Sequence, residues 1–418
     1  MAVPSLQRLI GGLSGLLGQG PIKIGVVFSV VLALALTLLN AAVPGLLGLE
    51  QWTSDLRTAI LSPSPPRQHP GLAVIAVTED TLARYPYREP VDRGLLAGLI
   101  RTADAAGASV IALDFRIDQP TEPAKDAELL DAIRKAKAPV VLGAADERVP
   151  LSESQESYQR HFIAQSERPA GYLNLSIDGD DVVRSSAGPG FGSLWDRPFA
   201  GLVAEASGKP ARGPGRIAWL KPPLNGNDTF AVYPAHLIYP ASAAAGAGLQ
   251  IDAYLRGRVV LIGALLPGVD EHQTPLTMID GGLMPGVLLQ AQMIAERLDG
   301  RRVYDVTGLP LFLVLTAVAF SSFVLGWLYR LKRFNAAVTV LAALCLLLVD
   351  ILAFQLLKLT FPFGTALIAT LASVTSGHVL ELVSRRLTRE SHADAATHVL
   401  ADGSGRRRLP VLGFRARH

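Results

Sequence analysis

Cysteine and charged residues are scarce in this chain of 418 residues, and each shortage excludes a class of protein. The single cysteine, Cys345, lies in an apolar run, so one chain can form neither a disulfide framework nor a cysteine-based zinc site. Charged residues make up only 18% of the chain, whereas soluble domains usually contain about a quarter. The 39 basic and 36 acidic residues nearly balance, which does not favour nucleic-acid binding. The remaining class is an integral membrane protein with a large water-exposed part.

Four apolar stretches are long enough to cross a membrane, which takes about 20 mainly apolar residues per helix. They are residues 24–46, 309–328, 336–357 and 363–383. A cleaved signal peptide is the alternative for the first stretch, but the stretch is long for one and Pro44 makes a poor cleavage site. We therefore expect an uncleaved anchor that follows a cytoplasmic segment of residues 1–23.

The clusters of basic residues that flank these four stretches all fall on one side, provided that the helices alternate in direction. The basic flanks contain Arg8, Lys23, Arg330, Lys332, Arg333, Arg385, Arg386 and Arg389. Short flanks rich in Lys and Arg stay in the cytoplasm, so we expect both termini, including the basic tail 384–418, on that side. Residues 49–306 then lie outside the membrane. A large domain without cysteine in that compartment is ordinary in bacteria, which favours the periplasmic face of a bacterial inner membrane.

The stretch from residue 49 to residue 306 alternates between strand-like and helix-like patterns. Short apolar runs typical of buried strands occur at 72–77, 109–113, 139–143 and 258–263, and helical patterns occur at 92–106, 125–136, 199–206 and 285–298. This alternation predicts an α/β domain in which a mixed or parallel sheet carries helices on both faces. The same patterns predict a hairpin at 172–184, a strand at 216–220 and a surface connection at 241–248.

Acidic residues follow two of the predicted strands, Glu79 and Asp80 after the first and Asp114 after the second. If these strands are parallel neighbours, their carboxyl ends meet at one crevice, where open α/β sheets bind ligands. A pocket for a polar ligand or a cation would then include Glu79, Asp80, Arg88, Asp114 and Gln119. The alternative is that Asp80 and Asp114 cap turns or pair with basic residues of the domain.

Two other polar clusters contain residue types that bind metals, but neither has the complete ligand pattern of a metal site. The turn Asp178–Asp181 lacks the ligand spacing and the later glutamate of a calcium loop, so it predicts a plain hairpin turn. His272 stands beside Asp270 and Glu271, but no second histidine completes a zinc motif. We expect no metal site, no cofactor and no catalytic constellation.

Two features lie within the apolar stretches. Asp350 either faces protein, because a carboxylate in lipid is costly, or reaches water near the outer interface beside Lys358. Small residues recur four apart in the last stretch and so share one helix face, where another helix could approach closely. They are Thr365, Ala369, Ser373 and Gly377.

Four groups of residues resemble the type-two CHASE domain, an extracytoplasmic sensory module of bacterial receptors. They are Glu50–Arg57 with its Asp-x-Arg pattern, Val77–Leu82 with Tyr85-Pro86-Tyr87, Ala106–Pro123, and a C-terminal group at 260–264, 274–276 and 284–287. The family also places three membrane helices after the domain, so the resemblance extends from about residue 49 to residue 383.

The resemblance implies a membrane sensor or receptor-like protein that binds a periplasmic ligand or protein. In many members the last membrane helix leads into a cyclase or kinase, but residues 384–418 are too few for such a domain. We therefore expect a chain that is not an enzyme and that acts through a partner protein. The alternative is a structural or scaffold subunit of a larger membrane assembly. Expected contacts are membrane lipids, protein partners and a possible homo-oligomer, without nucleic acid.

Overall fold

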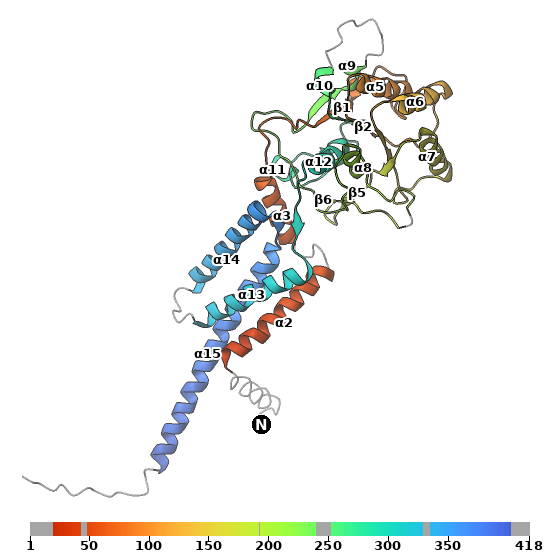
Figure 1. Ribbon diagram of the computed structural model, residues 1–418. Coiled ribbons are helices and arrows are strands. Elements are labelled where there is room, and N and C mark those ends of the chain that lie inside the picture. Colours follow the sequence, from red (N-terminus) through yellow and green to blue (C-terminus); the bar gives the residue numbers. More distant parts are fainter. Residues whose placement is uncertain (1–19, 43–47, 192, 240–251, 329–334, 403–418) are drawn as a thin grey trace, which may run out of the picture. The chain divides into compact units, whose positions relative to one another are not determined.

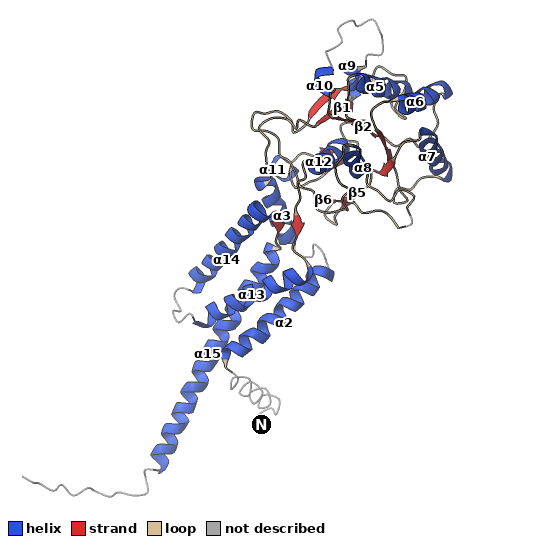
Figure 2. Ribbon diagram, in the orientation of Figure 1, coloured by secondary structure: helices blue, strands red, loops and turns tan. Residues whose placement is uncertain are grey.

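A computed structural model describes residues 20–42, 48–191, 193–239, 252–328 and 335–402 (Figures 1 and 2). The chain forms two compact units. The helical unit comprises the chain up to Glu50, Val306–Asp350 and the chain from Pro362, and the mixed unit comprises Gln51–Asp305 and Ile351–Phe361. The predicted connection at 241–248, the residues around Arg330 and the end of the basic tail lie outside the described residues.

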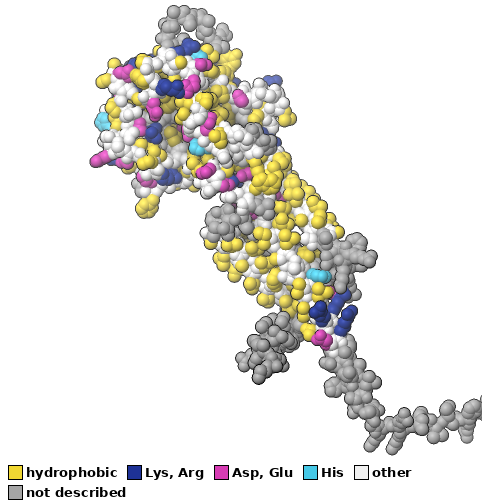
Figure 3. Space-filling view, turned by 180° about the vertical axis from the view of Figure 1, so that it is seen from behind, with side chains coloured by type: hydrophobic (Ala, Val, Ile, Leu, Met, Phe, Trp, Pro, Cys, Tyr) yellow, Lys and Arg dark blue, Asp and Glu magenta, His cyan; other side chains and the backbone are white. Residues whose placement is uncertain are grey.

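The helical unit contains four helices that are long and apolar enough to cross a membrane. They are α2 (Pro21–Ala42), α13 (Gly308–Leu328), α14 (Asn335–Leu352) and α15 (Phe363–Asp402). Hydrophobic side chains cover the part of this unit that Figure 3 displays, as expected of a surface that faces lipid. The four apolar stretches predicted from the sequence are confirmed as helices.

The last helix is longer than its apolar stretch. The predicted basic tail begins at residue 384, and α15 continues into it as far as Asp402. Residues 384–402 contain no glycine or proline, and Gly403 is the first residue after the helix that would favour its end.

The face of small residues on α15 is buried against α13. Ala369 and Ser373 are 0% exposed. A Cβ atom added at Gly377 would lie 2.2 Å from the carbonyl oxygen of Phe323, and one added at Gly326 would lie 2.2 Å from that of Val374. The two backbones therefore approach so closely that neither glycine has room for a side chain.

A six-stranded sheet, parallel throughout, forms the centre of the mixed unit. Its order is β4 (Ala170–Tyr172), β3 (Val140–Ala144), β2 (Val110–Asp114), β8 (Val259–Ala264), β1 (Leu72–Val77) and β7 (Ala231–Pro234). The predicted parallel sheet is confirmed, and β7 is a strand that the sequence patterns did not show. Strand β8 lies between β1 and β2, so those two strands are not neighbours.

Both faces of the sheet are covered by helices. Ala73, Ile75 and Val77 of β1 point into one hydrophobic cluster, while Leu72 and Val74 point into the other. The first cluster includes residues of α5 (Arg93–Ala105), α6 (Pro123–Lys135) and α7 (Glu153–Ser166), and the second includes residues of α8 (Phe199–Ala206) and α12 (Gly286–Leu298). The predicted arrangement, a sheet with helices on both faces, is confirmed. Helix α7 was not predicted from the sequence.

Shorter elements complete the mixed unit, including the predicted hairpin. They are α3 (Gly48–Leu61), α4 (Glu79–Leu82), β5 (Leu175–Ile177), β6 (Val183–Ser186), α9 (Ala235–Ile238), α10 (Asp252–Leu255), β9 (Glu271–His272), α11 (Thr277–Asp280), β10 (Met284–Pro285) and β11 (Tyr304–Asp305). Strands β5 and β6 pair antiparallel, and the carboxylates of Asp178 and Asp180 bind Arg184 across their turn. The plain hairpin turn is confirmed.

The predicted strand at 216–220 does not form as a strand, and only an isolated antiparallel bridge pairs Arg216 with Ser185 of β6. Ile217 donates its N–H to the carbonyl of Arg184 in β6, but the backbone groups of Ala218 and Leu220 bond to side chains instead of to a strand. Ala218 donates its N–H to Glu296, and Leu220 exchanges two hydrogen bonds with Gln292. An apolar pattern does not reveal which groups form hydrogen bonds with the backbone. Here side chains of helix α12 form those of Ala218 and Leu220.

The segment Ile351–Phe361 between the last two apolar helices belongs to the mixed unit. It contains a π-helix, η1 (Ala353–Leu357), and β12 (Leu359–Thr360), which pairs in parallel with β11. Arg57 of α3 donates a hydrogen bond to the carbonyl of Phe361, and its guanidinium lies 5.5 Å from the centre of the Phe354 ring. These contacts fix the segment to the domain.

Candidate functional site

A cavity of about 590 Å³ opens at the carboxyl ends of three neighbouring strands. Asp114 ends β2, Ala144 ends β3, and Asn174 follows β4. The loop after β8 contributes Asp270 and His272, and helix α12 closes the cavity with its first turns. Ligands of open α/β sheets bind in this position, outside the carboxyl ends of the strands.

Asp114 is the acidic group at the base of this crevice. Among the described residues, none forms a hydrogen bond with its carboxyl group. This argues against the alternative in which Asp114 caps its own turn. Burial, together with the nearby charge of Asp270, raises the pKa of Asp114 to about 8. At neutral pH the group is therefore mostly protonated and can donate a hydrogen bond to a ligand.

Asp270 and His272 form a second polar group at the rim. The Nε2 atom of His272 lies 2.9 Å from Oδ1 of Asp270, and the Asp270 side chain is largely exposed. Asp270 adopts a left-handed backbone with φ of 51°, and its carboxylate lies over Gly286 at the start of α12. The crevice thus presents an imidazole and a carboxylate opposite the Asp114 carboxyl.

The loops after β2 and β3 contribute arginine side chains to the cavity lining. Arg148 binds the buried carboxylate of Asp146 through Nε, at 2.9 and 3.0 Å, and its guanidinium lies 5.3 Å from the centre of the Tyr172 ring. The side chain of Arg148 is still 37% exposed. Arg116 lines the cavity as well, with its Nε bound to Asp118 at 2.7 Å. A ligand in the crevice would therefore meet acidic, basic and amide groups.

Of the five residues predicted to form the pocket, only Asp114 lines this cavity. Glu79 forms an exposed ion pair with Arg88, and Asp80 is exposed in the first turn of α4. The backbone carbonyl of Gln119 accepts a hydrogen bond from Arg93. The prediction required β1 and β2 to be neighbours, and the insertion of β8 separates their ends.

Sequence reasoning missed Arg148 and Asn174 and considered His272 only as a metal ligand. Asp270 and His272 follow the strand pattern at 258–263. This position after a predicted strand was the one feature of the sequence that could have placed them at the crevice. In the parts of the chain that the structure describes, no group of three His, Cys, Asp or Glu side chains has a geometry suited to a metal ion.

Two further polar features lie outside the crevice, an ion pair of Arg184 and the buried Asp350. Arg184 binds Asp55 through two hydrogen bonds of 2.8 and 2.6 Å, which join the hairpin to helix α3. Both side chains are buried, so the Asp-x-Arg pattern at residues 55–57 has a structural use. Asp350 is 3% exposed in α14, and this burial favours the interpretation in which it faces protein.

Comparison with protein families gives one match over most of the chain. The model described as the CHASE2 domain matches residues 29–329, from within α2 to the end of α13. Comparison with curated proteins gives no match, and neither does comparison with solved structures.

Proposed function

Since the chain belongs to the CHASE2 domain family, a family of extracytoplasmic sensory domains, we propose that it is a membrane sensor with its ligand site in the crevice around Asp114. The observation that carries this proposal is an acidic group without a hydrogen-bond partner among the described residues, in a cavity of about 590 Å³. Asp114 is half-buried, and polar groups drawn away from water are normally paired, so an unpaired one suits a ligand. The mixture of charges favours a small polar molecule that both donates and accepts hydrogen bonds.

The proposal places the domain in the periplasm and both termini in the cytoplasm of a bacterium. Basic residues support this orientation: Lys23 lies in the first turn of α2, and Arg385 and Arg386 follow the apolar part of α15. Short basic flanks remain cytoplasmic. The inner membrane is then the location of the four helices.

The proposal also includes a route for the signal. Phe361 is held by Arg57 in the domain, and α15 begins two residues later, at Phe363. A ligand that changes the domain would therefore act on α15 through a very short covalent link. We infer that α15 passes this change to a partner protein, and we assign no catalysis to the chain itself.

A thermal-shift screen of the full chain in lipid nanodiscs tests the ligand site. The full chain is needed because residues 351–361 are part of the mixed unit. A ligand at a hundredfold excess over its Kd stabilises the folded state by about 2.7 kcal/mol, which a melting curve resolves. We expect a small polar metabolite to raise the Tm of the wild type and to lose this effect in Asp114→Leu, which removes the hydrogen-bonding group at similar size.

The matched control is Asp131→Leu, which makes the same change at an exposed ion pair with Lys135 on α6. It should respond as the wild type does. A ligand that stabilises Asp114→Leu and the wild type equally would place the site elsewhere. If no periplasmic metabolite stabilises the wild type, the alternative of a scaffold subunit gains support.

A further inference from the structure

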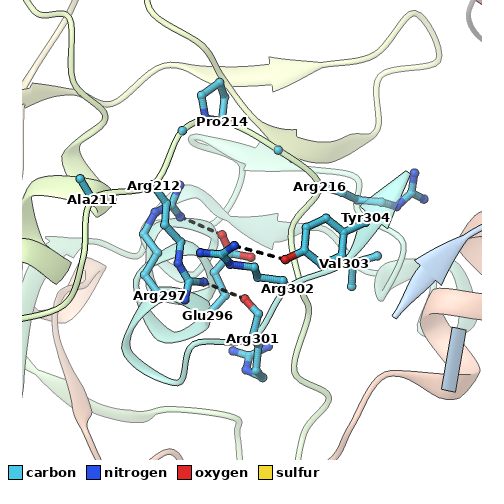
Figure 4. Close-up of a pocket in the computed structure, with 12 residues that line it drawn as sticks. Ala211, Arg212, Pro214, Arg216, Glu296, Arg297, Arg301, Arg302, Val303 and Tyr304 are labelled. Atoms are coloured by element: carbon cyan, nitrogen blue, oxygen red, sulfur yellow. Dashed lines mark hydrogen bonds and ion pairs between the residues drawn. The ribbon is translucent and has the colours of Figure 1, made fainter. Parts of the chain in front are cut away.

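A second cavity of the mixed unit, of about 350 Å³, has five arginines among its 12 lining residues (Figure 4). Its walls come from the loop before residue 217, the last turn of α12 and the segment that leads into β11. It shares no lining residue with the crevice around Asp114. The arginines are Arg212, Arg216, Arg297, Arg301 and Arg302, and the one acidic residue of the lining is Glu296.

The carboxylates nearby are already engaged. Glu296 accepts from Arg297 Nη1 at 2.8 Å through one oxygen and from the backbone N–H of Ala218 at 2.7 Å through the other. Outside the lining, Asp299 pairs with Arg301 at 2.9 Å, and Asp305 lies 3.4 Å from Arg216. These three carboxylates do not balance five guanidinium groups.

Arg212 and Arg302 have no acidic partner among the residues that the structure describes. Arg212 donates a hydrogen bond to the carbonyl of Arg301 at 3.0 Å, and Arg302 donates one to the hydroxyl of Tyr304 at 3.2 Å. Figure 4 shows both interactions beside the Glu296–Arg297 pair. Each guanidinium has five donor N–H groups, so most of those on Arg302 are free to bind a ligand.

Three buried guanidinium nitrogens of these arginines lack a hydrogen-bond partner in the described structure. They are Nε of Arg212, Nε of Arg297 and Nη2 of Arg301. Arg297 is 2% exposed, so its charge is almost fully removed from water. An unpaired buried donor is costly, more so when it carries charge, and buried charges are normally paired.

The pKa shifts of the lining arginines also favour a bound anion. Burial lowers the pKa of Arg216, Arg297 and Arg301, and the charge of Arg212 lowers that of Arg297 further. A bound anion would offset both the lost hydration and the repulsion between these groups.

We propose that this arginine cavity binds an oxyanion of the phosphate class. Guanidinium groups match phosphate oxygens with paired hydrogen bonds, and arginine is the usual residue for such planar recognition. The phosphate has two possible sources, a phosphate-bearing solute or the headgroup of an anionic phospholipid. Either would make this site independent of the crevice around Asp114.

The test measures the Tm of the full chain in nanodiscs of phosphatidylcholine and in nanodiscs that contain phosphatidylglycerol. Inorganic phosphate is titrated into the first set, against sodium chloride of matched ionic strength. Arg302→Gln and Arg212→Gln each remove one guanidinium, and Arg302 is exposed enough for its variant to fold. The matched control is Arg256→Gln, since that side chain is 69% exposed in a weak pair with Asp252.

A solute site is indicated if phosphate raises the Tm of the wild type and Arg302→Gln needs about ten times more phosphate for the same shift. A lipid site is indicated if only phosphatidylglycerol raises the Tm and Arg302→Gln loses that difference. In both cases Arg256→Gln should behave as the wild type does. The proposal is overturned if neither phosphate nor phosphatidylglycerol raises the Tm, or if all variants respond equally.

Discussion

The carboxylate of Asp270 lies over the α-carbon of Gly286, so close that an added Cβ would be 1.9 Å from its oxygen. Only glycine leaves room for this carboxylate at the start of α12. The same carboxylate pairs with His272 and raises the pKa of Asp114. The position of this side chain therefore adds to the effect of burial, which is the larger cause of the raised pKa of Asp114.

Gly286→Ala should displace Asp270 without unfolding the domain, because the exposed Asp270 side chain can rotate away. We expect the pKa of Asp114 to fall, since one of the two causes that raise it is removed. Asp270→Asn should lower this pKa as well, by removing the charge. The measurement is the pH at which the Tm stops falling as the pH rises.

Gly179→Ala is the control for that variant, because a Cβ at Gly179 meets open space. It should leave the pH profile of the Tm unchanged. A Gly286→Ala profile identical to that of the wild type would contradict the role given to Asp270.

Asp114 should make the protein less stable as the pH rises towards 8. The pKa of its carboxyl is about 8 in the folded chain against 3.8 for a free aspartate, so the folded state holds the proton more tightly. The stability from this group is complete below about pH 4 and is lost between about pH 4 and 8, by at most about 1.4 kcal/mol per pH unit. Asp114→Asn should therefore gain stability relative to the wild type over this range.

Melting curves at pH 5, 6, 7 and 8 check this expectation, with Asp131→Asn as the control whose difference from the wild type stays constant. A constant difference for Asp114→Asn as well would show that its carboxyl is ionised throughout.

Gly377→Leu should separate α13 from α15, because its side chain would meet the carbonyl of Phe323, which is backbone and cannot rotate away. Ala369→Leu should have a similar but smaller effect, since Ala369 is 0% exposed. Overpacking typically costs about 1–3 kcal/mol. A lower Tm of the full chain in detergent measures the loss. Thr375→Leu, on the exposed face of the same helix, should have little effect. Equal melting of Gly377→Leu and Thr375→Leu would refute the packing argument.

Cysteine labelling tests the orientation in the membrane. With Cys345 replaced by alanine, a cysteine at the exposed Ser154 or at Ser207 should react with an impermeant thiol reagent in cells stripped of any outer membrane. Cysteines at Ser5 and Ser404, both outside the described residues, should be protected until lysis. Labelling at Ser404 in intact cells would overturn the four-span topology.

The four helices and the parallel sheet follow from the sequence alone, because hydrophobicity and its period are local properties. Residues 72–77 are apolar throughout, as a strand covered on both faces must be, and the structure makes them β1. Asp92 marks the start of a helix, and it caps α5 by accepting a hydrogen bond from Leu95 at 3.0 Å. Such features depend on neighbours within a few positions of the chain.

The candidate sites depend on tertiary structure. Strand β8 enters the sheet between β1 and β2, which leaves Asp80 outside the crevice and brings Asp270 to Asp114 instead. Strand order is decided by the packing of the whole sheet, and no pattern near Asp114 reports it. For the same reason, Arg212 and Arg302 meet in one cavity although 89 residues separate Arg212 from its partner Arg301. Local patterns determined which elements form, and long-range packing decided which polar side chains share a cavity.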